Sequence, residues 1–419
     1  MYKLVIQGGK PLHGTVKASG SKNSSLPILF ASILADSPIT LNNTPHLSDI
    51  STTLRLLMSM GAEFILESDS SLFVDSSKLT NLVADYNLVK TMRASILVLG
   101  PMLAKYGEAK VSLPGGCAIG TRPVNLHLKA LEELNATIEV KNGYIYAKSK
   151  GLVGANIHFD QVTVTATENV IMAATLAKGT TTINNAAQEP EVSDLCFYLN
   201  KMGAKISGIG TSIIIIEGVK NLEGVQYSVC SDRIEAATYL VAAAITGGSI
   251  TVKNTNSQAM RSVLGKLIEI GADIKTGKDT ISLDMKGKRP KSVSIKTGAY
   301  PNFPTDMQAQ FTALNTIAEG HSSITENIFE NRFMHIPELM RMGADLMLEG
   351  NTVVCKGVKS LTGAHLMATD LRASASLVLA GLAAKGTTTI ERVYHLDRGY
   401  ETIEEKLKSL GADIERVQD

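Results

Sequence analysis

The chain has 419 residues, of which 44% are hydrophobic and 19% are charged, and its formal net charge is +1. This length allows two or three domains with separate hydrophobic cores, and the composition is that of an ordinary globular enzyme. A nearly neutral chain gives no reason to expect a nucleic-acid partner. The short basic stretch at residues 286–291 is best explained as a solvated loop.

Neither a membrane span nor a secretion signal is expected. The longest apolar stretches, such as residues 377–384, are much shorter than a bilayer requires. The N-terminus alternates like a strand and lacks the basic and apolar segments of a signal peptide. Four scattered cysteines (Cys117, Cys196, Cys230 and Cys355) have no spacing typical of zinc sites or disulfide frameworks. We therefore expect a reduced, cytoplasmic protein.

A short pattern recurs six times along the chain, at intervals of about 70 residues. It reads Leu-x-x-(Met/Leu/Ile)-(Gly/Asn)-Ala. Its leucine and the apolar residue three positions later lie on one helical face. The glycine then closes the last turn in the left-handed conformation, which asparagine also tolerates. The pattern predicts six helix ends, at Gly61-Ala62, Asn135-Ala136, Gly203-Ala204, Gly271-Ala272, Gly343-Ala344 and Gly411-Ala412.

Alternating strand patterns follow these helix ends, for example at residues 63–66 and 137–140. In most repeats an Ala-rich helix also breaks at a glycine and runs into a β-branched strand, as at residues 180–183 and 387–390. Each repeat thus reads helix, strand, helix, strand, and the fold class is α/β. Six repeats divide into two groups of three, with a boundary near residues 227–233.

Two segments carry residues that a core does not need. In residues 19–27, Lys22 and small residues open a helix, which predicts an anion site; a Ser-capped helix with an incidental lysine explains them equally well. In residues 113–123, glycines and prolines surround Cys117 and Arg122. This setting favours an accessible, reactive thiol over a small buried apolar group, the role that fits the other three cysteines.

Three helices predicted in the second half begin with an acidic residue, at Asp232, Asp306 and Asp370. An aspartate at this position is often only an N-cap, and that alternative remains open. Three such starts suggest helix N-termini gathered around one axis. Arginine suits planar, bidentate binding of carboxylate and phosphate. Four arginines stand at predicted junctions between loops and helices: Arg93, Arg332, Arg372 and Arg398.

Taken in order, these segments closely resemble the UDP-N-acetylglucosamine 1-carboxyvinyltransferases, a branch of the enolpyruvyl transferase family. The resemblance runs from residue 1 to about residue 417. The matching motifs are Lys22-Asn23, Pro114-Gly115-Gly116-Cys117-Ala118-Ile119-Gly120 with Arg122-Pro123-Val124, Phe303-Pro304-Thr305-Asp306-Met307-Gln308-Ala309-Gln310, Glu330-Asn331-Arg332-Phe333-Met334-His335 and Asp397-Arg398-Gly399-Tyr400.

The resemblance implies transfer of the enolpyruvyl group of phosphoenolpyruvate to the 3′-hydroxyl of UDP-N-acetylglucosamine, with release of phosphate through a tetrahedral intermediate. This reaction is the first committed step of peptidoglycan synthesis. The implied fold is a two-domain inside-out α/β prism, with helices in the centre and sheets outside, built from six repeats. Residues 22–229 would form the domain that carries the Cys117 loop. Residues 1–21 and 230–419 would form the other, with the active site in the cleft between them.

The resemblance also implies the roles of individual residues. Cys117 would donate the proton and Asp306 would act as the base, with Lys22 and Arg398 as further catalytic residues. Phosphoenolpyruvate would be bound by Lys22, Asn23, Arg122 and Arg398. The UDP-sugar would be bound by Arg93, Arg122, Pro123, Val124, Asn125, Leu126, Gln161, Val162, Thr163, Val164, Asp306 and Ile328, supported by Arg332, Asp370 and Arg372. The implied partners are these two small molecules, with no metal, cofactor, nucleic acid, membrane or obligate protein partner.

Four positions depart from the family pattern: His46 and Ser48 where lysines are common, Asn125 where Asp is common, and Thr165 where Gly is common. These changes bear on affinity. One alternative function is 5-enolpyruvylshikimate-3-phosphate synthase, which lacks the cysteine loop. Another is a six-repeat DNA sliding clamp, whose helices would need basic residues where these are rich in Ala, Leu and Met. A third is an inactive paralogue, against which the intact catalytic positions argue.

Overall fold

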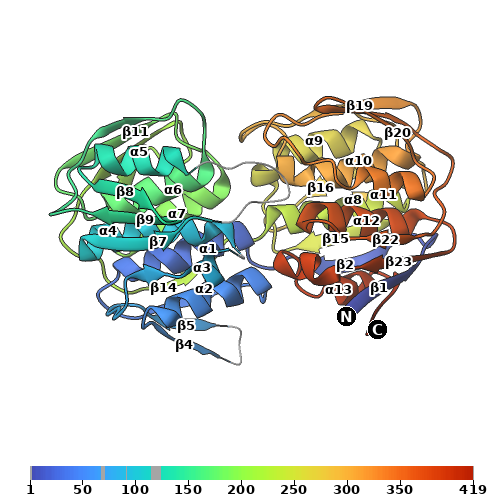
Figure 1. The fold of residues 1–419 in the computed structure, drawn as a ribbon. Coiled ribbons are helices and arrows are strands. Elements are labelled where there is room, and N and C mark those ends of the chain that lie inside the picture. Colours follow the sequence, from blue (N-terminus) through green and yellow to red (C-terminus); the bar gives the residue numbers. More distant parts are fainter. Residues whose placement is uncertain (1, 68–70, 91, 115–123, 419) are drawn as a thin grey trace. The chain divides into compact units, whose positions relative to one another are not determined.

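The computed structural model describes residues 2–67, 71–90, 92–114 and 124–418 (Figure 1). Contacts along the chain divide these residues into two compact units. The terminal unit contains the described residues up to Ser19 and from Ser231 onward. The middle unit contains the described residues between Gly20 and Cys230.

The middle unit contains three sheets in its described part. Its strands are β3 (Ile39–Asn42), β4 (Glu63–Leu66), β5 (Leu72–Asp75), β6 (Val83–Ala84), β7 (Glu108–Ser112), β8 (Thr137–Lys141), β9 (Tyr144–Lys148), β10 (Asn156–His158), β11 (Thr180–Asn184), β12 (Lys205–Ser207), β13 (Ile213–Glu217) and β14 (Gln226–Ser228). Its helices are α1 (Lys22–Ala31), η1 (Ser32–Leu34), α2 (Ser48–Ser59), α3 (Tyr86–Val89), η2 (Arg93–Val98), α4 (Leu99–Tyr106), α5 (Asn125–Glu133), α6 (Val164–Ala174) and α7 (Pro190–Lys201). The strand orders are β14-β3-β5-β4, β6-β7-β9-β8 and β10-β11-β13-β12.

The terminal unit repeats this plan. Its strands are β1 (Tyr2–Gln7), β2 (His13–Lys17), β15 (Ser249–Lys253), β16 (Asp273–Thr276), β17 (Thr280–Asp284), β18 (Ile295–Lys296), β19 (His321–Thr325), β20 (Asp345–Glu349), β21 (Thr352–Lys356), β22 (His365–Met367), β23 (Thr387–Glu391) and β24 (Asp413–Gln418). Its helices are α8 (Arg233–Ile245), η3 (Ser257–Met260), α9 (Arg261–Glu269), η4 (Thr305–Met307), α10 (Gln308–Ile317), α11 (Ile336–Arg341), α12 (Leu371–Ala383), η5 (Val393–Arg398) and α13 (Ile403–Ser409). The strand orders are β16-β17-β15-β2, β18-β19-β21-β20 and β22-β23-β1-β24.

Each described sheet combines one parallel pair with antiparallel neighbours. In the middle unit the last strand closes on the first repeat, because β14 pairs in parallel with β3. In the terminal unit β2 pairs in parallel with β15, and β1 lies between β23 and β24, antiparallel to both. The two ends of the chain are therefore neighbours in one sheet (Figure 1). The sequence pattern predicted two strands per repeat, and the sheets contain twice as many.

The six predicted helix ends are confirmed by the backbone. Gly61, Gly203, Gly271, Gly343 and Gly411 have φ between 89° and 110°, and Asn135 has φ of 71°. This left-handed region is reached easily by glycine and, among other residues, best by asparagine. A strand follows each of these positions within three residues: β4, β8, β12, β16, β20 and β24. The repeat is thus a helix that stops sharply and returns as an edge strand.

The centre of each unit is helical. In the terminal unit α8, α10 and α12 contact one another, and their ribbons lie close together in Figure 1. They are buried along almost their whole length. In the middle unit α1, α4 and α6 are the corresponding buried helices. The strands bury alternate residues against these helices, for example in β13 and β15. Helices that are buried all round must be apolar all round, which explains their Ala-rich sequences.

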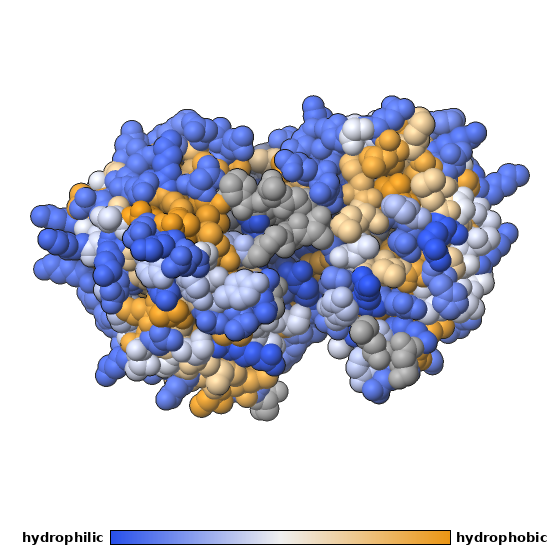
Figure 2. Space-filling view, in the orientation of Figure 1, coloured by the Kyte–Doolittle hydropathy of each residue, from blue (hydrophilic) through white to orange (hydrophobic). Residues whose placement is uncertain are grey.

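Hydrophilic residues cover much of the surface seen in Figure 2, with smaller apolar areas between them. Over the part of the chain that the structure describes, no helix combines the length and the apolar character needed to cross a membrane.

Candidate active site

Asp306 is held between two buried guanidinium groups. It lies in η4, directly before α10, where Arg332 Nη2 donates to its Oδ1 at 2.6 Å and Arg372 Nη2 donates to its Oδ2 at 3.0 Å. The two arginine side chains are 7% and 4% exposed, whereas that of Asp306 is 23% exposed. Charge-assisted hydrogen bonds of this kind fix both position and charge. The geometry therefore holds Asp306 as an oriented carboxylate that is partly open to solvent.

Both arginines are themselves held in place. Arg372 Nη1 donates to the Tyr400 hydroxyl oxygen at 3.2 Å, and Arg332 Nη1 donates to Thr305 Oγ1 at 2.7 Å. Burial alone would lower the pKa of Arg372, but the Asp306 carboxylate, together with Tyr400 and Asp232, raises that pKa on balance. Arg372 thus stays cationic although it is buried.

The other two acidic helix starts act as caps. Asp232 Oδ1 accepts from the backbone N–H groups of Ile234 and Glu235, and Asp370 Oδ1 accepts from those of Arg372 and Ala373. The cap alternative therefore holds for both residues. Asp306 differs, because the cap position of η4 is Pro304 and makes no side-chain bond. Helices α8, α10 and α12 pack together, so the three starts belong to one bundle, as predicted.

Ile328 is tied to the Asp306 segment through a buried glutamate that the sequence reasoning missed. The backbone N–H of Ile328 donates to Glu326 Oε1 at 2.7 Å. The other oxygen, Oε2, accepts from Thr305 Oγ1 at 2.8 Å. Glu326 is 2% exposed, and Ile328 is 41% exposed. In the loop after β19, the backbone of Ile328 is therefore held by a hydrogen bond, while its apolar side chain is exposed to solvent.

Lys22 begins α1 in the middle unit, and its partner is Asp49. The ammonium nitrogen lies 3.2 Å from Asp49 Oδ2, and the two side chains are 12% and 6% exposed. Ser21 caps the helix by accepting from the N–H of Ser24. The serine cap and the buried ion pair are both present here, so neither of the two sequence interpretations is excluded. Asn23 is the second residue of the helix and is half-buried.

Most of the residues predicted for the UDP-sugar stand at three helix starts of the middle unit. Arg93 begins η2, Asn125 begins α5, and Val164 begins α6 with Thr163 at its N-cap. Helices α5 and α6 pack together, and so do η2 and α6. The other residues predicted for the UDP-sugar that the structure describes in the middle unit are Val124, Leu126, Gln161 and Val162. Of these, Gln161 and Val162 are exposed.

His127 joins the starts of α5 and α6. Asn169 Nδ2 donates to its Nδ1 at 3.0 Å, and Thr165 Oγ1 lies 3.2 Å from its Nε2. Asn169 also accepts from Gly100 N–H through Oδ1, which fixes the orientation of the amide. With Nδ1 accepting, the neutral ring donates from Nε2 to Thr165. Thr165, one of the four departures from the family pattern, therefore has a structural partner.

We expect this histidine to make stability depend on pH. Burial, with a contribution from Arg93, lowers the pKa of His127 to about 3, below the ordinary value of about 6.5. The unfolded chain then binds more protons as pH falls from 6.5 toward 3, so the folded state loses up to about 1.4 kcal/mol per pH unit from this residue. The free energy of unfolding, measured with urea at several pH values, should fall less steeply with decreasing pH for His127→Gln than for the wild type. Equal slopes would contradict this account.

Arg398 is the last residue of η5 and is half-buried. It was predicted at a junction between a loop and a helix, and it lies where a 3-10 helix ends and a loop begins. Burial, followed by the charge of Arg398, lowers the pKa of the neighbouring His395. Asp397 forms an ion pair with Arg416, whose Nη2 donates to Asp397 Oδ1 at 2.7 Å.

Cys117, Arg122 and Pro123 lie outside the described residues, so the predicted roles of all three stay predictions. The other cysteines have the expected inert character. Cys196 and Cys355 are buried, and burial raises the pKa of each thiol to about 12. Cys230 is half-buried and lies 3.3 Å from Ser24 Oγ, and burial also raises its pKa.

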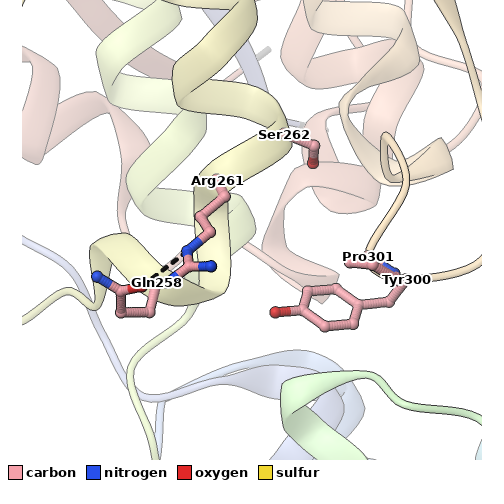
Figure 3. A pocket seen from close by; sticks show the side chains of 5 residues that line it. All are labelled: Gln258, Arg261, Ser262, Tyr300 and Pro301. Carbon is pink, nitrogen blue, oxygen red and sulfur yellow. Dashed lines mark hydrogen bonds between the residues drawn. The ribbon is translucent and has the colours of Figure 1, made fainter. Parts of the chain in front are cut away.

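A cavity of about 300 Å³ lies elsewhere in the terminal unit. It is lined by Gln258, Arg261, Ser262, Tyr300 and Pro301, and Figure 3 shows that Arg261 points toward Gln258, to which it donates hydrogen bonds. None of the predicted site residues that the structure describes is among these five.

Comparison with known proteins identifies the family of this chain. The family model described as EPSP synthase (3-phosphoshikimate 1-carboxyvinyltransferase) matches residues 6–407. The chain therefore belongs to this enolpyruvyl transferase family. Within the family it is similar over its whole length to UDP-N-acetylglucosamine 1-carboxyvinyltransferases. The one from Ruthia magnifica subsp. Calyptogena magnifica is 79% identical, and the one from Vesicomyosocius okutanii subsp. Calyptogena okutanii (strain HA) is 78% identical. Both matches cover 100% of each chain.

Solved structures confirm the predicted fold class. The enolpyruvyl transferase NikO from Streptomyces tendae matches with a TM-score of 0.90 at 25% identity, covering 100% of this chain and 99% of that one. The EPSP synthase from Acinetobacter baumannii matches with a TM-score of 0.77 at 19% identity, covering 100% of both chains. The second likeness concerns the fold alone.

Proposed function

We propose that this chain transfers the enolpyruvyl group of phosphoenolpyruvate to the 3′-hydroxyl of UDP-N-acetylglucosamine and releases phosphate. The observation that carries the proposal is 79% identity, over the full length, to a protein named for this carboxyvinyl transfer. The similarity to EPSP synthase is much lower, at 19% identity, and extends only to family and fold. The alternative of 5-enolpyruvylshikimate-3-phosphate synthase is therefore the weaker one.

Asp306 would take the proton of the sugar hydroxyl. Two guanidinium donors favour the ionised carboxylate, which is the form that accepts a proton. They also fix its direction, so that the hydroxyl is deprotonated only when it is bound in line. Ile328, exposed beside this segment, would contact the UDP-sugar, with Arg93 and the residues at the starts of α5 and α6 binding the rest of that molecule.

Cys117 would donate a proton to the methylene carbon of phosphoenolpyruvate. Protonation of the methylene carbon of phosphoenolpyruvate makes its second carbon electrophilic, and the sugar oxygen then bonds to that carbon. Addition turns the methylene into a methyl group. The tetrahedral intermediate then loses a proton from this methyl group while the C–O bond to phosphate breaks, which releases phosphate and leaves the enol ether. Lys22, Asn23, Arg122 and Arg398 would hold the phosphate and carboxylate, and cations placed in this way stabilise the departing phosphate.

The wider context belongs to the same proposal. The reaction would start peptidoglycan precursor synthesis in the cytoplasm, and so would serve cell shape and division. Its partners would be the two small molecules alone. Fosfomycin would inhibit by alkylating Cys117. The two-domain organisation at residues 22–229 and 1–21 with 230–419, with residues from both domains acting in one cleft between them, is likewise proposed.

The choice of acceptor tests the proposal. Phosphate release from phosphoenolpyruvate is measured with UDP-N-acetylglucosamine, with shikimate 3-phosphate and with neither. Release that requires the sugar nucleotide supports the proposal. Release that requires shikimate 3-phosphate would establish the alternative, and no release with either acceptor would favour an inactive paralogue.

A further inference from the structure

The hydroxyl oxygen of Tyr400 is the centre of a buried polar network in the terminal unit. Tyr400 follows η5 and is 1% exposed. Its oxygen lies 3.2 Å from Arg372 Nη1, 3.3 Å from Gln310 Nε2 and 3.0 Å from Thr238 Oγ1. These partners come from α12, α10 and α8 respectively, so one atom connects all three central helices of the unit.

The donors and acceptors of this network can be assigned. Thr238 Oγ1 donates its single proton to the Ile234 carbonyl at 2.7 Å, so it accepts from the Tyr400 hydroxyl. The Tyr400 oxygen in turn accepts from Arg372 and Gln310, both of which are pure donors at the atoms concerned. Burial raises the pKa of Tyr400, although Arg372 opposes this, so the phenol keeps its proton.

Two separate connections lead from this oxygen to Asp306. Through the first, Arg372 uses Nη1 on the tyrosine and Nη2 on the Asp306 carboxylate, which fixes the plane of the guanidinium. Through the second, Gln310 Nε2 donates one proton to the backbone carbonyl of Asp306 at 2.9 Å, and its other proton faces the Tyr400 oxygen at 3.3 Å together with Thr238 Oγ1 at 3.2 Å. The side chain and the backbone of Asp306 are thus oriented from one atom.

We propose that Tyr400 is a positioning residue, whose hydroxyl orients the Asp306 carboxylate through Arg372 and Gln310. This inference rests on the proposed function for its kinetic consequence, but its geometric content does not. Because Tyr400 contacts Asp306 only through other residues, its removal should misplace the base rather than abolish it. Misplacement by about 1 Å costs up to about 100-fold in rate.

The first test observes the Arg372 guanidinium directly. In the wild type its two terminal nitrogens are bound to different acceptors, so rotation about the Nε–Cζ bond should be slow and the Nη protons should give separate NMR signals. Tyr400→Phe should average these signals, and Arg372→Lys assigns them. Tyr239→Phe is the matched control. Tyr239 is also fully buried in this unit, but its hydroxyl donates to Glu235 Oε1 at 3.2 Å and not to Arg372 or Gln310.

The second test separates positioning from folding by kinetics. Tyr400→Phe should lower kcat by about 10- to 100-fold while KM for phosphoenolpyruvate stays within about twofold. Thr238→Val should have a smaller effect, and the double variant should be slowed by less than the product of the two single effects, because Thr238 and Tyr400 contact each other and share Gln310 Nε2. Tyr239→Phe should retain the wild-type kcat.

The outcomes are distinguishable from failure of the proposed function. Averaged Arg372 signals in Tyr400→Phe but not in Tyr239→Phe, with the fall in kcat, support the inference. Unchanged signals, or the same change in both variants, overturn it whatever the activity. Wild-type protein that is inactive with both acceptors contradicts the proposed function alone, and the NMR comparison then still decides the positioning role.

Discussion

Asp306→Asn should slow phosphate release by at least about 100-fold, the usual contribution of a general base. The asparagine amide is nearly the same size but cannot take up the proton of the sugar hydroxyl. It also leaves Arg332 and Arg372, 7% and 4% exposed, without their anionic partner. The measurement is kcat with UDP-N-acetylglucosamine and phosphoenolpyruvate at saturation. KM for phosphoenolpyruvate should change little, because that substrate is assigned to other residues.

Loss of the carboxylate should also destabilise the fold, by about 3 kcal/mol, since it breaks a largely buried ion pair. Activity must therefore be measured where circular dichroism shows the variant to be folded. Asp345→Asn is the control, because Asp345 is an exposed residue of β20. It should match the wild type in both stability and rate. A folded Asp306→Asn enzyme with more than about a tenth of the wild-type kcat would exclude Asp306 as the base.

Leu267→Ala should lower the free energy of unfolding by about 2–5 kcal/mol. Leu267 is the leucine of the repeated helix-end pattern in α9 and is fully buried. Removing its methyl groups leaves a cavity that the packed sheet and helices can fill only in part. Urea denaturation followed by circular dichroism measures the change.

The adjacent residue in the same helix provides the control. Ile268 is 57% exposed, so Ile268→Ala removes a side chain of equal size from the solvent side. Its effect should stay within about 0.5 kcal/mol. Similar losses for the two variants would mean that the repeat pattern does not define the buried face.

The repeats were predictable because helix termination is local chemistry. A helix that ends in the left-handed conformation requires glycine or asparagine at that position, so each repeat shows the end directly in its sequence. Asn135 replaces glycine at one of the six ends and has the same left-handed conformation. Strands such as β5 and β13 were missed. They are placed by pairing with a strand that comes before them in the chain, which a local pattern does not record.

The sequence singled out Asp306 at a helix start but left the N-cap alternative open. The structure shows that Asp306 does not cap η4 and that two arginines bind its carboxylate instead. Asp49, Glu326 and Tyr400 were missed as partners. Each is buried and contacts a residue more than 20 positions away, respectively Lys22, Thr305 and Arg372, so only the fold brings these pairs together. Tyr400 was present in the matched motif, which marked it without explaining it.

The departures from the family pattern divide in a similar way. Thr165 is accounted for by its contact with His127, and Asn125 simply begins α5. Ser48 begins α2, one residue before Asp49, the partner of Lys22. A lysine at position 48 would add positive charge beside that pair, so its absence bears on anion affinity near Lys22.

The measurement that tests the central claim most directly is phosphate release from phosphoenolpyruvate by the wild type and by Cys117→Ala, with and without UDP-N-acetylglucosamine. The account predicts release that requires the sugar nucleotide and falls by at least about 100-fold in the variant, because proton donation to the methylene carbon is lost. Release that is independent of the sugar nucleotide, or that is unchanged in Cys117→Ala, would contradict it.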